Sequence, residues 1–220
     1  MNKLRRRKNL LVFLINEVVG MYFRWLVGIV FVLLLGGCKD VLNKPLEGQE
    51  DDLSRYVFVG NWVAEDKNIR LELKKTDKSG WYQFTVQEPE RLVEGKVKVA
   101  GFKRKLAVSV EMASLRVNGE PLVRDDKQAY FLVGVYYDDD ELRIAPADMG
   151  KFERNFSDYF FAVPIETAAF CIRGNENCKK TFTSGNLLVS KNRRKFNEDF
   201  VKHFRTVFPR SESIVFIPAS

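Results

Sequence analysis

Residues that could carry out covalent or acid–base chemistry are scarce in this chain. It has 220 residues, among them three cysteines and a single histidine, His203. A nucleophilic enzyme needs a base beside its nucleophile, and one histidine removes most dyads and triads. The acidic run over residues 138–141 lacks the spaced ligands and central glycine of a calcium loop. We therefore expect no catalytic residues, no metal and no cofactor.

One thiol nevertheless has neighbours that favour modification. Cys38 follows Leu35, Gly36 and Gly37, and a basic segment and an apolar run over residues 25–35 precede them. The run is shorter than the ~20 residues of a membrane-spanning helix and suits a secretory signal. The pattern resembles the lipobox of bacterial lipoproteins, in which cleavage precedes the cysteine and its thiol carries the lipid. The resemblance covers residues 1–38 and implies a signal peptide over 1–37 and a palmitate-type anchor on Cys38.

An uncleaved anchor is the alternative to lipidation. A helix over Val18–Leu35 would contain Arg24, which costs roughly 2.5 to 3.5 kcal/mol at a helix centre and less near an end. Both interpretations export residues 39–220. Lys39, rather than aspartate, follows the cysteine, which resembles the sorting pattern of outer-membrane lipoproteins. That resemblance implies an anchor in the outer membrane of a bacterial cell envelope, facing the periplasm.

Charge and the other two cysteines agree with export. The net charge is +7, but residues 38–220 carry only 30 Lys and Arg against 28 Asp and Glu, so we expect no nucleic-acid partner. An oxidising periplasm would pair Cys171 with Cys178. Closing that loop would stabilise the fold by on the order of 2.5 kcal/mol. Two free thiols are the alternative, and two cysteines are too few for a structural zinc site.

The exported part divides by pattern. Residues 38–54 comprise the cysteine and a polar stretch without hydrophobic periodicity, which is typical of a tether. From 55 to about 145 the apolar residues alternate, which predicts half-buried strands. Asn118-Gly119 is the clearest hairpin signal, and residues 129–137 are apolar almost throughout, as in a strand covered on both faces. About eight short strands joined by turns predict a mainly β fold, an antiparallel barrel or sandwich.

The first of these strands contains Gly60 and Trp62. Their Gly-x-Trp spacing resembles the motif that opens lipocalin-like barrels, where the tryptophan closes one end. The resemblance implies an arginine packed across the indole, and Arg143 is the residue expected there, in a cation–π pair worth about 0.5 to 2 kcal/mol. It also implies that Gly60 leaves room for close backbone approach.

Residues 146–220 have a different character. Asp148 is expected to cap a helix over about 149–158. Phenylalanines at spacings of three and four predict a second helix over about 192–208, with a stripe that packs in the core, contact with a membrane being the alternative. Residues 213–217 read as a closing strand. We expect this helix-containing part to pack on the β domain.

Together these features predict a lipid-anchored, non-enzymatic envelope lipoprotein. Its barrel would bind a small apolar ligand or an envelope protein. The alternative is an inhibitor or assembly partner that presents the loops of a filled barrel to a protein target. An open apolar pocket would favour ligand binding and a filled interior would favour the loops. The expected lining is Trp62, Tyr82, Phe84 and Phe131.

Overall fold

The computed structural model divides the chain into two compact units, Met1–Gly37 and Cys38–Ser220. Every described residue belongs to the second unit. The described residues are 40–48, 59–64, 68–103, 105–122, 129–138, 141–168, 182–191 and 195–219. The expected signal segment, Cys38, Cys171 and Cys178 therefore lie outside them.

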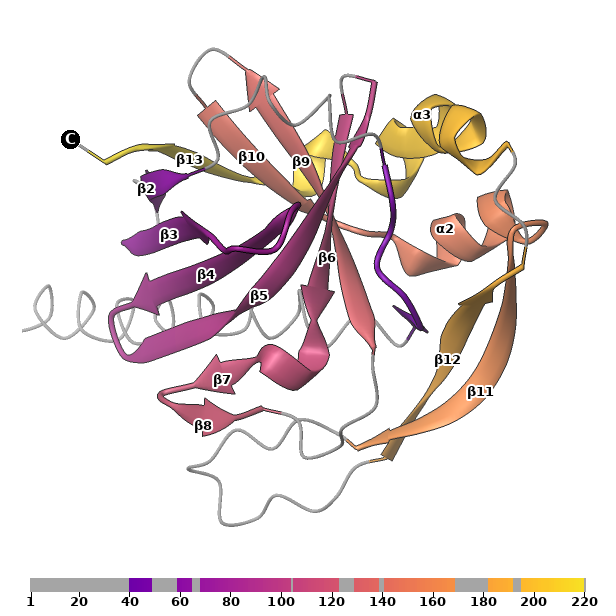
Figure 1. The fold of residues 1–220 in the computed structure, drawn as a ribbon, viewed down its shortest axis with the longest axis horizontal. Helices are drawn as coiled ribbons and strands as arrows, with labels where there is room; N and C mark the ends of the chain where they lie inside the picture. The colour runs from indigo at the N-terminus through magenta and orange to yellow at the C-terminus, as the bar shows by residue number, and fades with distance from the viewer. Residues whose placement is uncertain are drawn as a thin grey trace, which may run out of the picture. The chain divides into compact units, whose positions relative to one another are not determined.

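Eight strands of the second unit form a closed antiparallel barrel (Figure 1). Each pairs with the next along the chain, and the last pairs back onto the first, so the order is that of an up-and-down meander. Closure leaves the ring without a free edge. The mainly β fold class predicted from the alternating pattern is confirmed. The strands are β2 (Gly60–Ala64), β3 (Ile69–Lys75), β4 (Trp81–Glu88), β5 (Arg91–Phe102), β6 (Lys105–Glu111), β9 (Tyr130–Asp138), β10 (Glu141–Pro146) and β13 (Ile214–Pro218).

Strand register fixes which residues face the lumen. Directly opposed residues of antiparallel strands lie on the same face of a sheet. Trp62 opposes Leu71, Leu71 opposes Val86, and Val86 opposes Val93, so this row lines one face around four strands. Their neighbours in sequence face outward. The alternating pattern of the sequence is thus the pattern of lumen and exterior.

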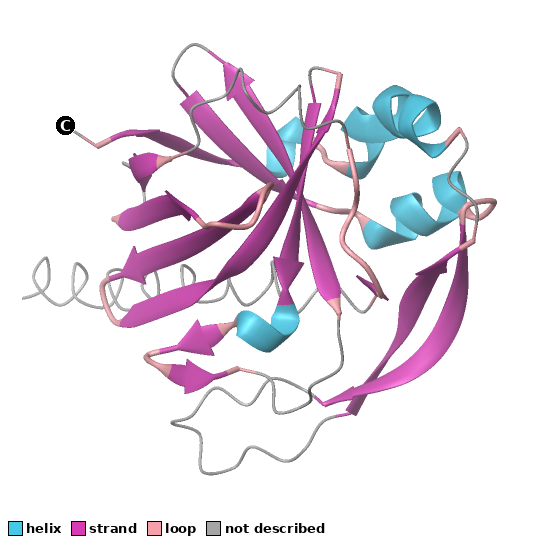
Figure 2. Ribbon diagram, viewed as in Figure 1, coloured by secondary structure: helices cyan, strands magenta, loops and turns pink. Residues whose placement is uncertain are grey.

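A large hydrophobic core cluster lies outside the barrel wall. Helices α2 (Met149–Phe156) and α3 (Phe196–Val207) cover the outer faces of β5, β6, β9 and β10 (Figure 2). Rings pack edge to face across this layer, as between Phe102 and Phe196 and between Tyr136 and Phe204. Five phenylalanines in the layer have no exposed surface: Phe152, Phe156, Phe200, Phe204 and Phe208.

Both helices were predicted from sequence, with small differences at their ends. Asp148 caps α2, its carboxylate accepting a hydrogen bond from the Lys151 backbone N–H at 2.9 Å. The apolar stripe of α3 is buried against the barrel. This confirms core packing for the stripe rather than contact with a membrane. The turn prediction also holds, because Asn118 and Gly119, with φ of 51° and 81°, join β7 (Arg116–Val117) to β8 (Glu120–Pro121).

The tether prediction is wrong for its described part, residues 40–48. Val41–Leu42 form strand β1, which pairs with β9 and runs parallel to β12 (Phe182–Ser190). The Leu46 backbone N–H donates to the buried Ser109 hydroxyl at 3.0 Å, on the outer face of β6. Val41, Leu42 and Leu46 are buried, and the last two belong to the core cluster under the helices, which docks this otherwise polar stretch.

The C-terminal part is interwoven with the barrel rather than packed on a finished one. β13 was expected to be a closing strand, and it occupies the place between β10 and β2. The boundary drawn at residue 145 therefore divides the barrel itself. A hairpin of β11 (Phe160–Ala168) and β12 follows α2 and was not predicted.

Candidate functional site

All four residues expected to bind a ligand face the lumen. Tyr82 opposes Val97, Phe84 opposes Gly95, and Phe131 opposes Val110. With Trp62 they form part of one continuous inner surface, and all four are buried. Burial raises the pKa of the Tyr82 phenol above its ordinary value.

The expected pair of Arg143 and Trp62 is not formed, because these residues lie on opposite faces. Leu142 and Ile144 face the lumen, so Arg143 between them faces outward, where its guanidinium binds Glu141. The Trp62 indole instead meets the Tyr137 ring edge to face, with the centroids 6.3 Å apart. Trp62 thus packs against an aromatic side chain.

Gly60 also acts differently from its expected role. A Cβ atom there would come no closer than 4.0 Å to another atom, the indole nitrogen of Trp62, so no tight backbone approach requires glycine. Its φ of +149° is the reason instead, because L side chains rarely adopt this conformation.

The lumen retains apolar surface that solvent can reach. Val133 and Ile144 lie inside their strands and face inward, yet both are partly exposed, and Val110 near the end of β6 is exposed in the same way. By contrast, the phenylalanines under the helices are fully buried. Val133 opposes Pro146 at the end of β10, and Ile144 opposes Ile214 at the start of β13, so this reachable apolar surface lies near one end of the barrel. A small apolar molecule could contact this surface.

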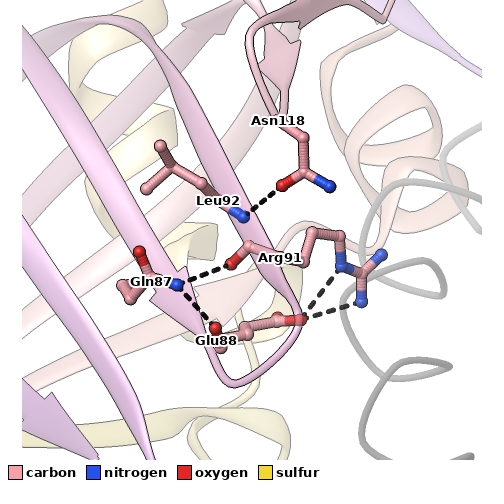
Figure 3. A network of polar contacts seen from close by, with 5 residues as sticks. All are labelled: Gln87, Glu88, Arg91, Leu92 and Asn118. Carbon is pink, nitrogen blue, oxygen red and sulfur yellow. Dashed lines mark hydrogen bonds and ion pairs between the residues drawn. The ribbon is translucent and has the colours of Figure 1, made fainter.

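A charged pair stands at one end of this lumen (Figure 3). Glu88 ends β4 and Arg91 begins β5, and they continue the inward-facing row of Val86 and Val93. Arg91 donates from Nε and Nη2 to Glu88 Oε2, at 3.1 and 2.8 Å. Glu88 is only 5% exposed, and its Oε1 has no hydrogen-bond partner among the described residues. β6 and β10 end, and β9 and β13 begin, at this same end of the barrel.

Neighbouring polar groups hold the turn that carries the pair. Gln87 Nε2 donates to the backbone carbonyl of Glu88 at 2.7 Å and more weakly to that of Arg91 at 3.4 Å. Asn118 reaches across from the β7–β8 turn, accepting at Oδ1 from the Leu92 backbone N–H at 2.8 Å. The backbone beneath Glu88 and Arg91 is therefore fixed from both sides.

Sequence reasoning missed this pair, although the signal was present. Glu88 continues the alternation of Tyr82, Phe84 and Val86, so it falls on the inward face. Only two residues, Pro89 and Glu90, separate it from Arg91, and they form the turn. A carboxylate in an apolar row with a cation directly opposite is the pattern that should have identified it.

Other polar contacts lie on the outer layer. The Tyr159 hydroxyl donates to Asp199, and this hydrogen bond raises the pKa of the phenol to about 12. The Lys105 ammonium donates to the Val201 carbonyl and lies over the Phe204 ring, and burial there lowers the pKa of Lys105. His203 is half-buried and meets the Phe156 ring edge to face. These contacts join α3 to α2 and the barrel.

Within the described residues, no group of three or more potential His, Cys, Asp or Glu ligands is close enough to hold a metal. None of the helices in this part of the chain has the length and apolarity of a membrane span. Comparison with protein-family models, curated proteins and solved structures finds no match to the chain.

Proposed function

We propose that this protein is a non-enzymatic envelope lipoprotein whose barrel binds a small apolar ligand in its lumen. The observation that carries the proposal is the partly exposed, inward-facing surface of Val133 and Ile144. Solvent-reachable apolar surface enclosed by a β wall is the usual setting for an apolar ligand. It favours ligand binding over the alternative of a filled barrel that acts through its loops.

The barrel architecture supports a lipocalin-like mode of binding. A closed meander of eight antiparallel strands is the arrangement in which lipocalins hold ligands. Trp62 in the first barrel strand agrees with that resemblance, whereas the outward Arg143 departs from it. The proposal therefore rests on the lumen and not on the arginine.

Anchoring through Cys38 is proposed from the sequence pattern. A lipid on this thiol, a periplasmic location at the outer membrane, and a disulfide between Cys171 and Cys178 all stay predictions. The two cysteines fall between the end of β11 and the start of β12, outside the described residues. A disulfide there would tie the tip of that hairpin.

Native mass spectrometry of the full chain, released gently from detergent, tests ligand binding. We expect a mass increment from a co-purified small molecule. Val133→Phe should remove it, because the larger ring fills the accessible lumen, whereas Val215→Phe on the outer face should retain it. An increment that persists unchanged in Val133→Phe would contradict the lumen as the binding site.

A further inference from the structure

The inner face of the barrel carries a carboxylate oxygen that has no hydrogen-bond partner among the described residues. Glu88 Oε1 is buried and accepts no hydrogen bond from the described residues, while Oε2 takes both donors of Arg91. Leaving a buried acceptor unsatisfied is costly, and more so when the group is charged. Native structures contain few such groups, and each calls for an explanation, a bound group being one of them.

The surroundings of Glu88 indicate what kind of group would bind. Its strand neighbours on the inner face, Val86 and Phe84, are apolar, and the partly exposed Val110, Val133 and Ile144 line the wall formed by β6, β9 and β10. The unsatisfied oxygen is thus a buried acceptor in an inward-facing row that is otherwise apolar. A ligand with one polar end and an apolar body matches this distribution.

We propose that Glu88 anchors the neutral, hydroxyl-bearing head of an elongated apolar molecule, such as a long-chain alcohol or a monoacylglycerol. This inference rests on the proposed function, since it assigns the ligand class of the same lumen. The hydroxyl donates to Oε1, and the apolar chain lies along Phe84 and Val133. The carboxylate and the guanidinium neutralise one another, so the anchor suits an uncharged head.

Charge argues against a fatty-acid anion in this orientation. Its carboxylate would set oxygen lone pairs against Glu88 Oε1 and would meet Arg91 donors, Nε and Nη2, that already bind Oε2. The alcohol gains a hydrogen bond to a charged acceptor, whereas the acid meets repulsion there. This difference corresponds to a preference for the alcohol over the acid of about tenfold or more.

Photolabelling of the full chain in detergent tests the assignment. A long-chain alcohol and a fatty acid of equal length, each with a diazirine in the tail, are photolysed with the protein at equal concentration. Mass spectrometry then locates the attachment sites. For the natural chain we expect attachment to inward-facing residues of β4 and β9, with the alcohol favoured over the acid by about tenfold.

The Glu88→Gln variant should lower that preference by about tenfold, because the carboxamide can donate to an acid and carries no charge. Glu72→Gln, on the outer face and paired with Lys74, is the matched control and should leave the preference unchanged. If Glu88→Gln fails to fold, Glu88→Asp is the second variant. It keeps the charge, but its shorter side chain moves the carboxylate away from the hydroxyl of the alcohol, so labelling by the alcohol should fall.

The outcomes separate the two proposals. Lumen labelling by both probes with the same ratio in the natural chain and in the Glu88 variants would overturn the anchor and leave ligand binding intact. Labelling confined to outer residues, with neither probe in the lumen, would overturn the proposed function and the anchor together.

Discussion

At the scale of single residues, the position of each side chain on the barrel wall decides its role. Trp62 and Arg143 are both on barrel strands, yet one faces the lumen and the other solvent, since a shift of one residue reverses the face. The same rule places Glu88 inside. Trp81, at the start of β4, faces outward but is buried in the outer core cluster together with Ala100 and Phe102.

Truncation of Trp62 should be costly because its ring fills the lumen beside Tyr137. We expect Trp62→Ala to lower the free energy of unfolding by ~3 to 5 kcal/mol, a large part of the ~5 to 15 kcal/mol that stabilises a domain. Chemical denaturation measures this difference. Phe161→Ala is the control, since that ring is 44% exposed on β11, and it should change stability by no more than ~0.5 kcal/mol. Equal effects would contradict the proposed packing of the indole.

Gly134 should tolerate no side chain. It lies on the outer face of β9, and a Cβ atom there would come within 2.4 Å of Phe208 Cγ. Gly134→Ala must displace the ring and should destabilise the protein by ~1 to 3 kcal/mol. Gly150→Ala on α2, where the nearest atom would be 3.5 Å away, should instead stabilise it by ~0.4 to 1 kcal/mol. Thermal unfolding of the two variants should therefore shift in opposite directions.

At the scale of elements, the start of helix α2 is stabilised by a residue next to it in sequence, Asp148. Burial alone would raise the pKa of Asp148, but hydrogen bonds from Lys151 outweigh it and lower the pKa below its ordinary value. Because the folded pKa lies below the unfolded one, the carboxylate stabilises the fold above the unfolded pKa. That contribution is lost as the pH falls through the folded pKa.

Substitution of this cap separates hydrogen bonding from charge. Asp148→Ala should cost ~1 kcal/mol near neutral pH. Asp148→Asn should retain most of the capping energy, because asparagine is an equally good cap, but should lose the pH-dependent part of the contribution. Denaturation at neutral and at acidic pH measures both effects. An asparagine variant with the full acid sensitivity of the natural protein would contradict the assignment.

Elements governed by local pattern were predictable, and those governed by distant pairing were not. Three features could be predicted because they depend on residues close together in sequence. They are the alternation over β3 to β6, the Asn118-Gly119 turn and the apolar stripe of α3. β1 is a pair of apolar residues in a polar stretch, and only its pairing with β12 makes it a strand. The Glu88–Arg91 pair was within reach, since both its face and its turn are local. The outward face of Arg143 required the strand register.

At the scale of the whole molecule, the anchor and the barrel are close in sequence. If Cys38 carries a lipid, β1 begins three residues later, a reach of about 10 Å. Residues 40–48 are bound to the barrel, so they cannot act as a spacer. A lipidated chain would hold the barrel at the bilayer surface rather than away from it.

Lipidation itself is tested by Cys38→Ser. This variant should be neither cleaved nor lipidated, because no other cysteine of the chain follows a pair of small residues behind an apolar run. Incorporation of labelled palmitate measures the result. Cys171→Ser is the matched control and should still be labelled. Palmitate that continues to enter the Cys38→Ser variant would contradict the assignment.

Closure by β13 also determines when the barrel can finish folding. The ring joins Val63 of the first barrel strand to Ile217 of the last, and nothing in between can substitute for that contact. Until the chain up to residue 218 is available for folding, β2 and β10 are open edges that can pair with other chains. Contacts so distant in sequence form slowly. A chain threaded across a membrane would therefore remain an incomplete sheet throughout its passage, and the lumen would come into existence only at the end of transport.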